Sequence, residues 1–275
     1  MLLSGAQLLG PVARRLICPE RWTDAYPAWE SFAQELDALL EYADAEGGLH
    51  HLAPRLESKN AQRDEALEEL RVAYWLHNWR FPVVRWEPRG LGGKVGEYLI
   101  STPEKKRVFV EVKSPGWEGQ LSNAERQAGR AKQPKYQNLE GGAVGNWIPL
   151  QKCIASAKTY PKFAPTQPNL LVVADDLMVP LHYCLDHVEV ALYNRHPGYG
   201  TTGYFNSPSY ENLGGVGIFR AFSGGRGVEY EFKIFDNPFA LPATKLPASL
   251  MGTFKEKKTG IVRATFTGNT TRHVF

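Results

Sequence analysis

The sequence has few cysteines and no long apolar run, which argues against a disulfide-bonded protein and against a membrane-spanning one. Its 275 residues include three cysteines, far apart and without a CxxC pair, so we expect neither a disulfide framework nor a thiolate zinc site. No window of about 18 uninterrupted apolar residues occurs, so we expect no membrane span. Gly10-Pro11 interrupt the short apolar stretch near the N-terminus, which is not the pattern of a signal peptide. We therefore expect a soluble protein in the reducing cytoplasm.

A large excess of charge of either sign is also missing. The formal net charge is +3 at pH 7, which permits an anionic partner without requiring one, so any nucleic-acid surface must be local. Hydrophobic residues make up 43% of the chain, which is enough for a substantial core in one large domain or two small ones.

The first part of the chain has the apolar period of amphipathic helices. From Trp29 to Tyr42, apolar residues recur every three or four positions, which predicts a helix. A second helix is predicted from about Gln62 to Asn78, where the same period holds. We therefore interpret residues 1–61 as an N-terminal helical section.

After Pro82, short apolar runs alternate with glycine and polar residues, which is typical of strands and turns. Residues 114–147 are polar and glycine-rich and are interpreted as an insertion or lid. A helix is predicted at 148–160, "IPLQKCIASAKTY", and a buried strand at 168–177, "PNLLVVADDL". Together these elements predict an α/β core over residues 62–184.

The remaining residues, 185–275, are rich in Gly, Tyr, Phe and Asn and are predicted to be mostly β. Strands are predicted at "VEVALYN" (188–194), "GGVGIFRAF" (214–222) and "VEYEFKIFD" (228–236). The predicted fold is therefore α/β, with a mixed central sheet flanked by helices. A helical section precedes this core, and a β-rich C-terminal extension packs on it.

The stretch "VFVEVKSP", residues 108–115, combines the pattern of a buried strand with charged residues. Side chains alternate along a strand, so Phe109, Glu111 and Lys113 share one face while the valines share the other. Buried charge is costly unless it is paired, hydrogen-bonded or bound to metal. The pattern therefore indicates either a functional site or merely a sheet edge.

A hairpin between "EYLIST" and this strand would bring a second acid to the same face. A turn centred on Glu104 pairs Glu97 with Glu111, although a register slip of one residue would break this pairing. Like charges opposite one another are destabilising, and a divalent cation with hard oxygen ligands would neutralise them. Two carboxylates, a backbone carbonyl and waters suit Mg²⁺, and Lys113 could hold an attacking water.

The order of these features resembles the PD-(D/E)xK nuclease superfamily, which has the restriction-endonuclease-like fold. An acid, a hairpin turn and Glu-x-Lys at the end of an apolar strand follow a helix that carries Glu69 in the spacing E-x-x-V-x-x-x-L. The resemblance implies that Glu97, Glu111 and the backbone carbonyl of Val112 hold Mg²⁺ or Mn²⁺. Lys113 would position the water, and Glu69 would assist through a metal-bound water. The implied function is a metal-dependent nuclease, with DNA ahead of RNA as substrate.

The first acid departs from the superfamily pattern. It is usually Asp, often after Pro, and here it is Glu97 after Gly96. Glutamate reaches one methylene further, so the metal geometry could differ or activity could be lost. Glu87, in "RWEPRG", is the other candidate for this acid. A non-catalytic module with a degraded site that binds nucleic acid or protein, and a purely structural domain, stay open as alternatives.

Basic residues for a nucleic acid are predicted in the insertion and in the helix after it. Aromatic residues lie among the basic ones of the insertion, so phosphates and unpaired bases could be held there, although a solvated loop fits the same residues. The predicted nucleic-acid-binding residues are Arg126, Arg130, Lys132 and Lys135 in the insertion and, by the resemblance, Gln151, Lys152 and Lys158 in the helix. No membrane partner is expected, and a homodimer stays open.

Overall fold

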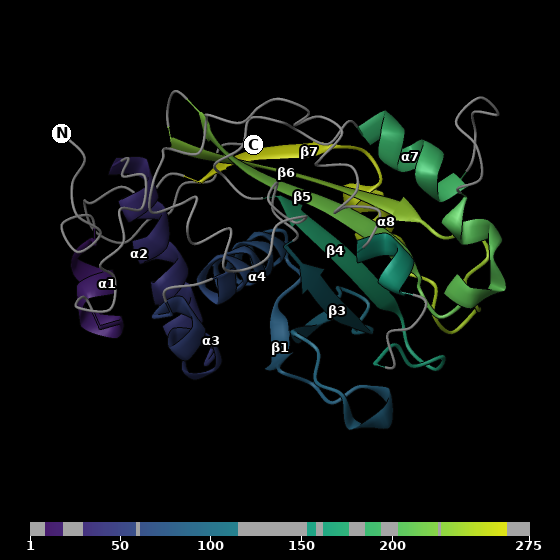
Figure 1. Cartoon of the computed structure of the whole chain (residues 1–275), viewed down its shortest axis with the longest axis horizontal. Helices are drawn as coiled ribbons and strands as arrows, with labels where there is room; N and C mark the ends of the chain where they lie inside the picture. The colour runs from purple at the N-terminus through teal and green to yellow at the C-terminus, as the bar shows by residue number, and fades with distance from the viewer. Residues whose placement is uncertain are drawn as a thin grey trace.

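In the computed structural model, a mixed sheet forms the centre of the protein (Figure 1). The structure describes residues 9–18, 30–58, 61–114, 153–157, 162–175, 185–193, 203–224 and 227–262. Within these residues, seven strands lie across the sheet in chain order: β1 (Val83–Trp86), β2 (Tyr98–Ser101), β3 (Arg107–Lys113), β4 (Asn169–Asp175), β5 (Gly215–Gly224), β6 (Gly227–Asp236) and β7 (Lys258–Val262). The pairs β3–β4 and β4–β5 are parallel and the others antiparallel. Strands β5 to β7 thus continue the sheet that β1 to β4 begin.

Helices cover both faces of this sheet. They are α1 (Pro11–Leu16), α2 (Glu30–Ala45), α3 (Leu49–Leu56), α4 (Ala61–Asn78), α7 (Leu185–Tyr193) and α8 (Ala248–Phe254), with short 3-10 turns at Leu91–Gly93, Tyr204–Asn206 and Pro208–Tyr210. Alternate residues of β4 point to opposite faces, Leu170 and Val172 into the layer of α4, and Leu171 and Val173 into the layer of α7. The mixed α/β sheet flanked by helices is therefore confirmed.

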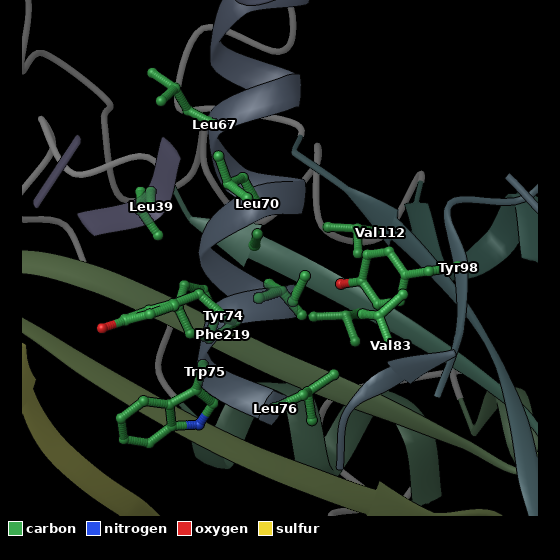
Figure 2. Packing of buried hydrophobic residues seen from close by; sticks show 14 of the residues in the cluster. Leu39, Leu67, Leu70, Tyr74, Trp75, Leu76, Val83, Tyr98, Val112 and Phe219 are labelled. Carbon is green, nitrogen blue, oxygen red and sulfur yellow. The ribbon is translucent and has the colours of Figure 1, made fainter. Parts of the chain in front are cut away.

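Helix α4 organises the larger of the two cores. Its residues Leu70, Tyr74 and Leu76 gather above the sheet residues Val83, Tyr98, Val112 and Phe219 (Figure 2). Residues 66–76 of α4 are all buried, because the helix packs against α2 and α3 as well as against the sheet. Helix α4 therefore lies directly over the hairpin β2–β3, and α1 to α3 pack beside it (Figure 1).

A buried ion cluster joins α2 and α4 to β6. The Arg71 side chain is only 1% exposed, and it donates from Nε and Nη2 to the two carboxylate oxygens of Glu35 at 2.8 and 2.9 Å. Its Nη1 pairs with Glu68, and the Tyr230 hydroxyl donates to Glu35. Removing one member of such a cluster would leave buried charge without compensation, so these groups stabilise the fold as a set.

The predicted elements agree with the structure except in the C-terminal part. The helices predicted at 29–42 and 62–78 correspond to α2 and α4, but the strand predicted at 188–194 is wrong, because Leu185–Tyr193 form α7. Val188, Ala191 and Leu192 are buried at the three- and four-residue spacing of a helix. Over so short a run, the sequence also fits the two-residue period of a strand. Helix α8 and strand β7 were not predicted.

Two predicted elements fall mainly on residues whose structure is not described. The helix predicted at 148–160 is described only at residues 153–157, which are helical, and the insertion at 114–147 lies outside the described residues apart from Ser114. Divisions of the chain after residues 61 and 184 stay predictions. Among the described helices, none combines the length and the apolar character that crossing a membrane requires.

Candidate active site

The hairpin β2–β3 places two glutamates side by side. Tyr98 pairs with Val110, which is the register expected from a turn centred on Glu104. Continued by one residue, this register sets Glu97 opposite Glu111, and the two carboxyl groups are in hydrogen-bond contact. Because β2 and β3 are antiparallel, the pair lies at the end of the hairpin away from the turn.

The carboxylate pair is largely withdrawn from water. Glu111 is fully buried and the Glu97 side chain is 12% exposed. Leu99 and Phe109, the next residues on the same face of the sheet, are also buried and give the pair an apolar floor. Burial of two neighbouring acids is unfavourable unless other groups compensate it.

Two lysines supply that compensation. Lys113, at the end of β3, has its Nζ 2.7 Å from Glu111 Oε1 and 3.6 Å from Glu97 Oε1. Lys162, in the segment before β4, has its Nζ 2.5 Å from the same Glu111 oxygen and 4.0 Å from Glu97 Oε2. Lys162 was not among the predicted site residues, because no strand or helix period relates it to Glu111. The available signal was its context in "YPKFAP", where two prolines restrict the backbone.

The two acids of the pair differ in their affinity for protons. Burial raises the pKa of Glu97 well above its ordinary value, and the contact with Glu111 raises it further. Burial also acts to raise the pKa of Glu111, but the contacts with Glu97, Lys113 and Lys162 outweigh it and hold that pKa below its ordinary value. The contact between the two carboxyl groups therefore acts in opposite directions on them, raising the pKa of Glu97 and lowering that of Glu111.

Glu69 lies near this pair but is held by an arginine. Arg55 of α3 donates from Nη1 to Glu69 Oε1 at 2.7 Å and from Nη2 to Glu69 Oε2. Burial raises the pKa of Glu69, whereas Arg55 and the more distant Lys113 act in the opposite direction. This bidentate ion pair with Arg55 engages both carboxylate oxygens of Glu69. Glu69 therefore lies near the Glu97–Glu111 pair but has a separate partner.

Glu87, the other candidate for the first acid, has a different partner. Its Oε2 lies 3.0 Å from His51 Nδ1, and its side chain is 45% exposed. Its backbone N–H donates to the Glu97 carbonyl at 2.9 Å, which connects the segment before β2 to β1. Glu97, and not Glu87, is therefore the acid that faces Glu111.

The carboxylate pair offers oxygens of the kind that a divalent cation binds. Apart from their contacts with each other and with the lysines, Glu97 Oε2 and both oxygens of Glu111 are buried without a hydrogen-bond donor among the described residues. Such hard oxygen ligands fit Mg²⁺ and Mn²⁺.

Further protein ligands for such an ion are few. No group of three or more His, Cys, Asp or Glu side chains arranged to hold a metal ion occurs in the described part of the chain. The protein would therefore contribute the two carboxylates and the backbone carbonyl of Val112, whose side chain is buried beneath α4. Water or substrate would complete the coordination, as is usual for Mg²⁺.

The predicted nucleic-acid-binding residues are not placed relative to this site. Arg126, Arg130, Lys132, Lys135, Gln151, Lys152 and Lys158 all lie outside the described residues. Next to the site, the segment 89–95 between β1 and β2 is glycine-rich and exposes Arg89, Leu91 and Lys94. Basic and apolar residues are thus exposed in the segment that leads into Glu97.

Comparison of the chain with protein families, with curated proteins and with solved structures gives no match. The resemblance to the PD-(D/E)xK superfamily therefore stays a hypothesis, and the chemistry of the site is the basis for any function inferred for this chain.

Proposed function

We propose that this protein is a metal-dependent nuclease of the restriction-endonuclease-like type and that it acts on DNA. The observation that carries the proposal is the buried Glu97–Glu111 pair with Lys113 on the same strand face. An exposed ion pair at a sheet edge would not bury two acids against each other, since that arrangement costs stability. The order of α4, the antiparallel strands β1 to β3 and the parallel strand β4 also supports the proposal, because the same order underlies the resemblance.

The residues of the site divide the chemistry among them. A divalent cation held by Glu97, Glu111 and the Val112 carbonyl would supply Lewis-acid stabilisation of the negative charge that develops on the phosphate oxygens. Lys113, with its ammonium group on Glu111, is placed to orient a water or a phosphate oxygen beside the acids. Glu69 would act only through an intervening water, because Arg55 holds both of its carboxylate oxygens.

Cleavage assays test this proposal directly. Supercoiled plasmid, linear single-stranded DNA and RNA are incubated with Mg²⁺ or Mn²⁺ and either wild type, Glu111→Gln or Lys113→Met. We expect wild type to cut DNA and each variant to lose at least about a hundredfold in rate, the usual effect of removing a group that stabilises developing charge. Lys106→Met is the matched control, because Lys106 is exposed at the opposite end of the same hairpin. Cleavage that survives in Glu111→Gln, or that continues in excess chelator, would refute the assignment.

A non-catalytic nucleic-acid- or protein-binding module is the second candidate. The observation in its favour is that the charged groups already satisfy one another, since Arg55 holds Glu69 and two ammonium groups contact Glu111. This candidate predicts no measurable binding of Mn²⁺ and no cleavage. A homodimer and a cytoplasmic location stay predictions under either function.

A further inference from the structure

Lys162 occupies a position that the proposed chemistry does not explain. Its ammonium group contacts the same oxygen of Glu111 that Lys113 contacts, at 2.5 and 2.7 Å respectively. Two ammonium groups thus converge on one oxygen of a fully buried carboxylate.

The backbone around Lys162 fixes this position. Its carbonyl accepts a hydrogen bond from the Leu91 N–H at 3.3 Å, and its Nζ donates to the Val95 carbonyl at 2.9 Å. A methyl group added at Gly90 would collide with the Lys162 backbone, so the two segments are in close contact. The Lys162 side chain is 17% exposed, about half the exposure of Lys113. Its ammonium group is therefore held on the acids by tertiary structure.

The two lysines differ in how they could respond to a metal ion. Lys113 ends β3, and its side chain projects from the same face of the strand as Glu111. Lys162 lies in the segment before β4, and its Nζ already has a second acceptor in the Val95 carbonyl. An ammonium group that leaves Glu111 would therefore keep a hydrogen-bond partner.

We propose that Lys162 is an internal counter-cation, which compensates the Glu97–Glu111 pair in the metal-free protein and which a divalent metal ion displaces from Glu111. The inference rests on the proposed function, because it assumes that these acids bind a metal ion. Lys162 is thus a positioning residue that sets the affinity for the ion. It competes with the ion for one carboxylate oxygen, and competition of this kind lowers affinity by the coupling between the two cations.

Isothermal titration of the whole 275-residue chain with Mn²⁺, in the absence of nucleic acid, tests the inference. We expect Lys162→Met to bind Mn²⁺ about tenfold more tightly than wild type, within the usual range of such couplings. Lys162→Arg keeps the charge and is expected to bind no more tightly than wild type. Unchanged or weaker binding by Lys162→Met would overturn the inference and leave the nuclease proposal intact. Absence of Mn²⁺ binding in wild type and in both variants would overturn both.

A second measurement uses the unaltered protein, in case Lys162→Met does not fold. A crystal structure of wild type with Mn²⁺ bound should show the Lys162 ammonium group beyond hydrogen-bond distance from Glu111 and still near the Val95 carbonyl. A structure in which Lys162 remains on Glu111 beside the bound ion would refute the displacement.

Discussion

Replacing Glu97 by glutamine is expected to stabilise the metal-free protein at neutral pH. The Glu97 carboxyl is largely buried and in contact with Glu111, and burial together with this contact raises its pKa well above the ordinary value. Glutamine has nearly the same shape, carries no charge and can donate a hydrogen bond to Glu111. The variant Glu97→Gln therefore keeps the contact and removes the cost of ionising a second acid beside the first.

The size of the effect depends on pH in a defined direction. Below the ordinary pKa of 4.5, Glu97 is protonated in both the folded and the unfolded chain, so wild type and variant should have similar free energies of unfolding. Above that pH the unfolded chain releases the proton and the folded chain retains it, so wild type loses stability and the variant does not. Two like charges that lie directly opposite each other on neighbouring strands lower the free energy of unfolding by about 0.2–1 kcal/mol when exposed, and by more when buried. We expect a gain of about 1 kcal/mol or more at pH 7.5, which is about 2–4 °C in melting temperature.

Urea denaturation in the presence of chelator, at pH 4, 6 and 7.5, measures this difference. Glu87→Gln is the control, because Glu87 lies in the same part of the chain but is half exposed and paired with His51. The control should change the free energy of unfolding by no more than about 0.5 kcal/mol. A loss of stability in Glu97→Gln at pH 7.5 would refute the reasoning. That result would show that attraction between Glu97 and the two lysines outweighs burial and the contact with Glu111.

Two further predictions concern the scaffold. Arg71→Met should lower the free energy of unfolding by about 3–5 kcal/mol in urea denaturation, because it leaves two buried carboxylates uncompensated. Tyr230→Phe, which removes one donor to the same cluster, should cost only about 1–2 kcal/mol, and equal losses would contradict this account. Gly252→Ala in α8 should raise the melting temperature with a gain of about 0.5–1 kcal/mol, since the added methyl group meets no atom within 4 Å. Gly260→Ala, whose methyl group would lie 2.5 Å from the Trp75 ring, should lose stability, and the reverse order of these two variants would refute the prediction.

The parts of the site that lie close in sequence were predictable. Glu97, Glu111 and Lys113 belong to one hairpin, so strand alternation and the position of the turn determine which face they share. Helix α4 was predictable for a similar reason, since its apolar period extends over many turns. Local patterns thus predicted both the helix that carries Glu69 and the hairpin that carries the acids.

The parts that reach the site through tertiary packing were not predictable. Arg55 comes from α3 and Lys162 from the segment before β4, and no local spacing relates either residue to the acids that it contacts. The helix α7 was missed for a different reason, because a run of seven residues does not separate a strand period from a helical one. Sequence patterns therefore predicted the acids and Lys113, but not Arg55 and Lys162, the cations that reach the acids through tertiary packing.

The two buried charge clusters of this protein show how a structural cluster differs from a candidate site. In the Arg71 cluster the arginine and its glutamates are almost completely enclosed, so no ligand can approach without unfolding the surrounding helices. In the Glu97–Glu111 cluster, by contrast, the side chains of Lys113 and Glu97 are 34% and 12% exposed. Both clusters incur the cost of desolvating charge, but of the two only the second has charged side chains that reach solvent. This difference in exposure is the reason why we propose a function for the hairpin acids and a structural role for Arg71.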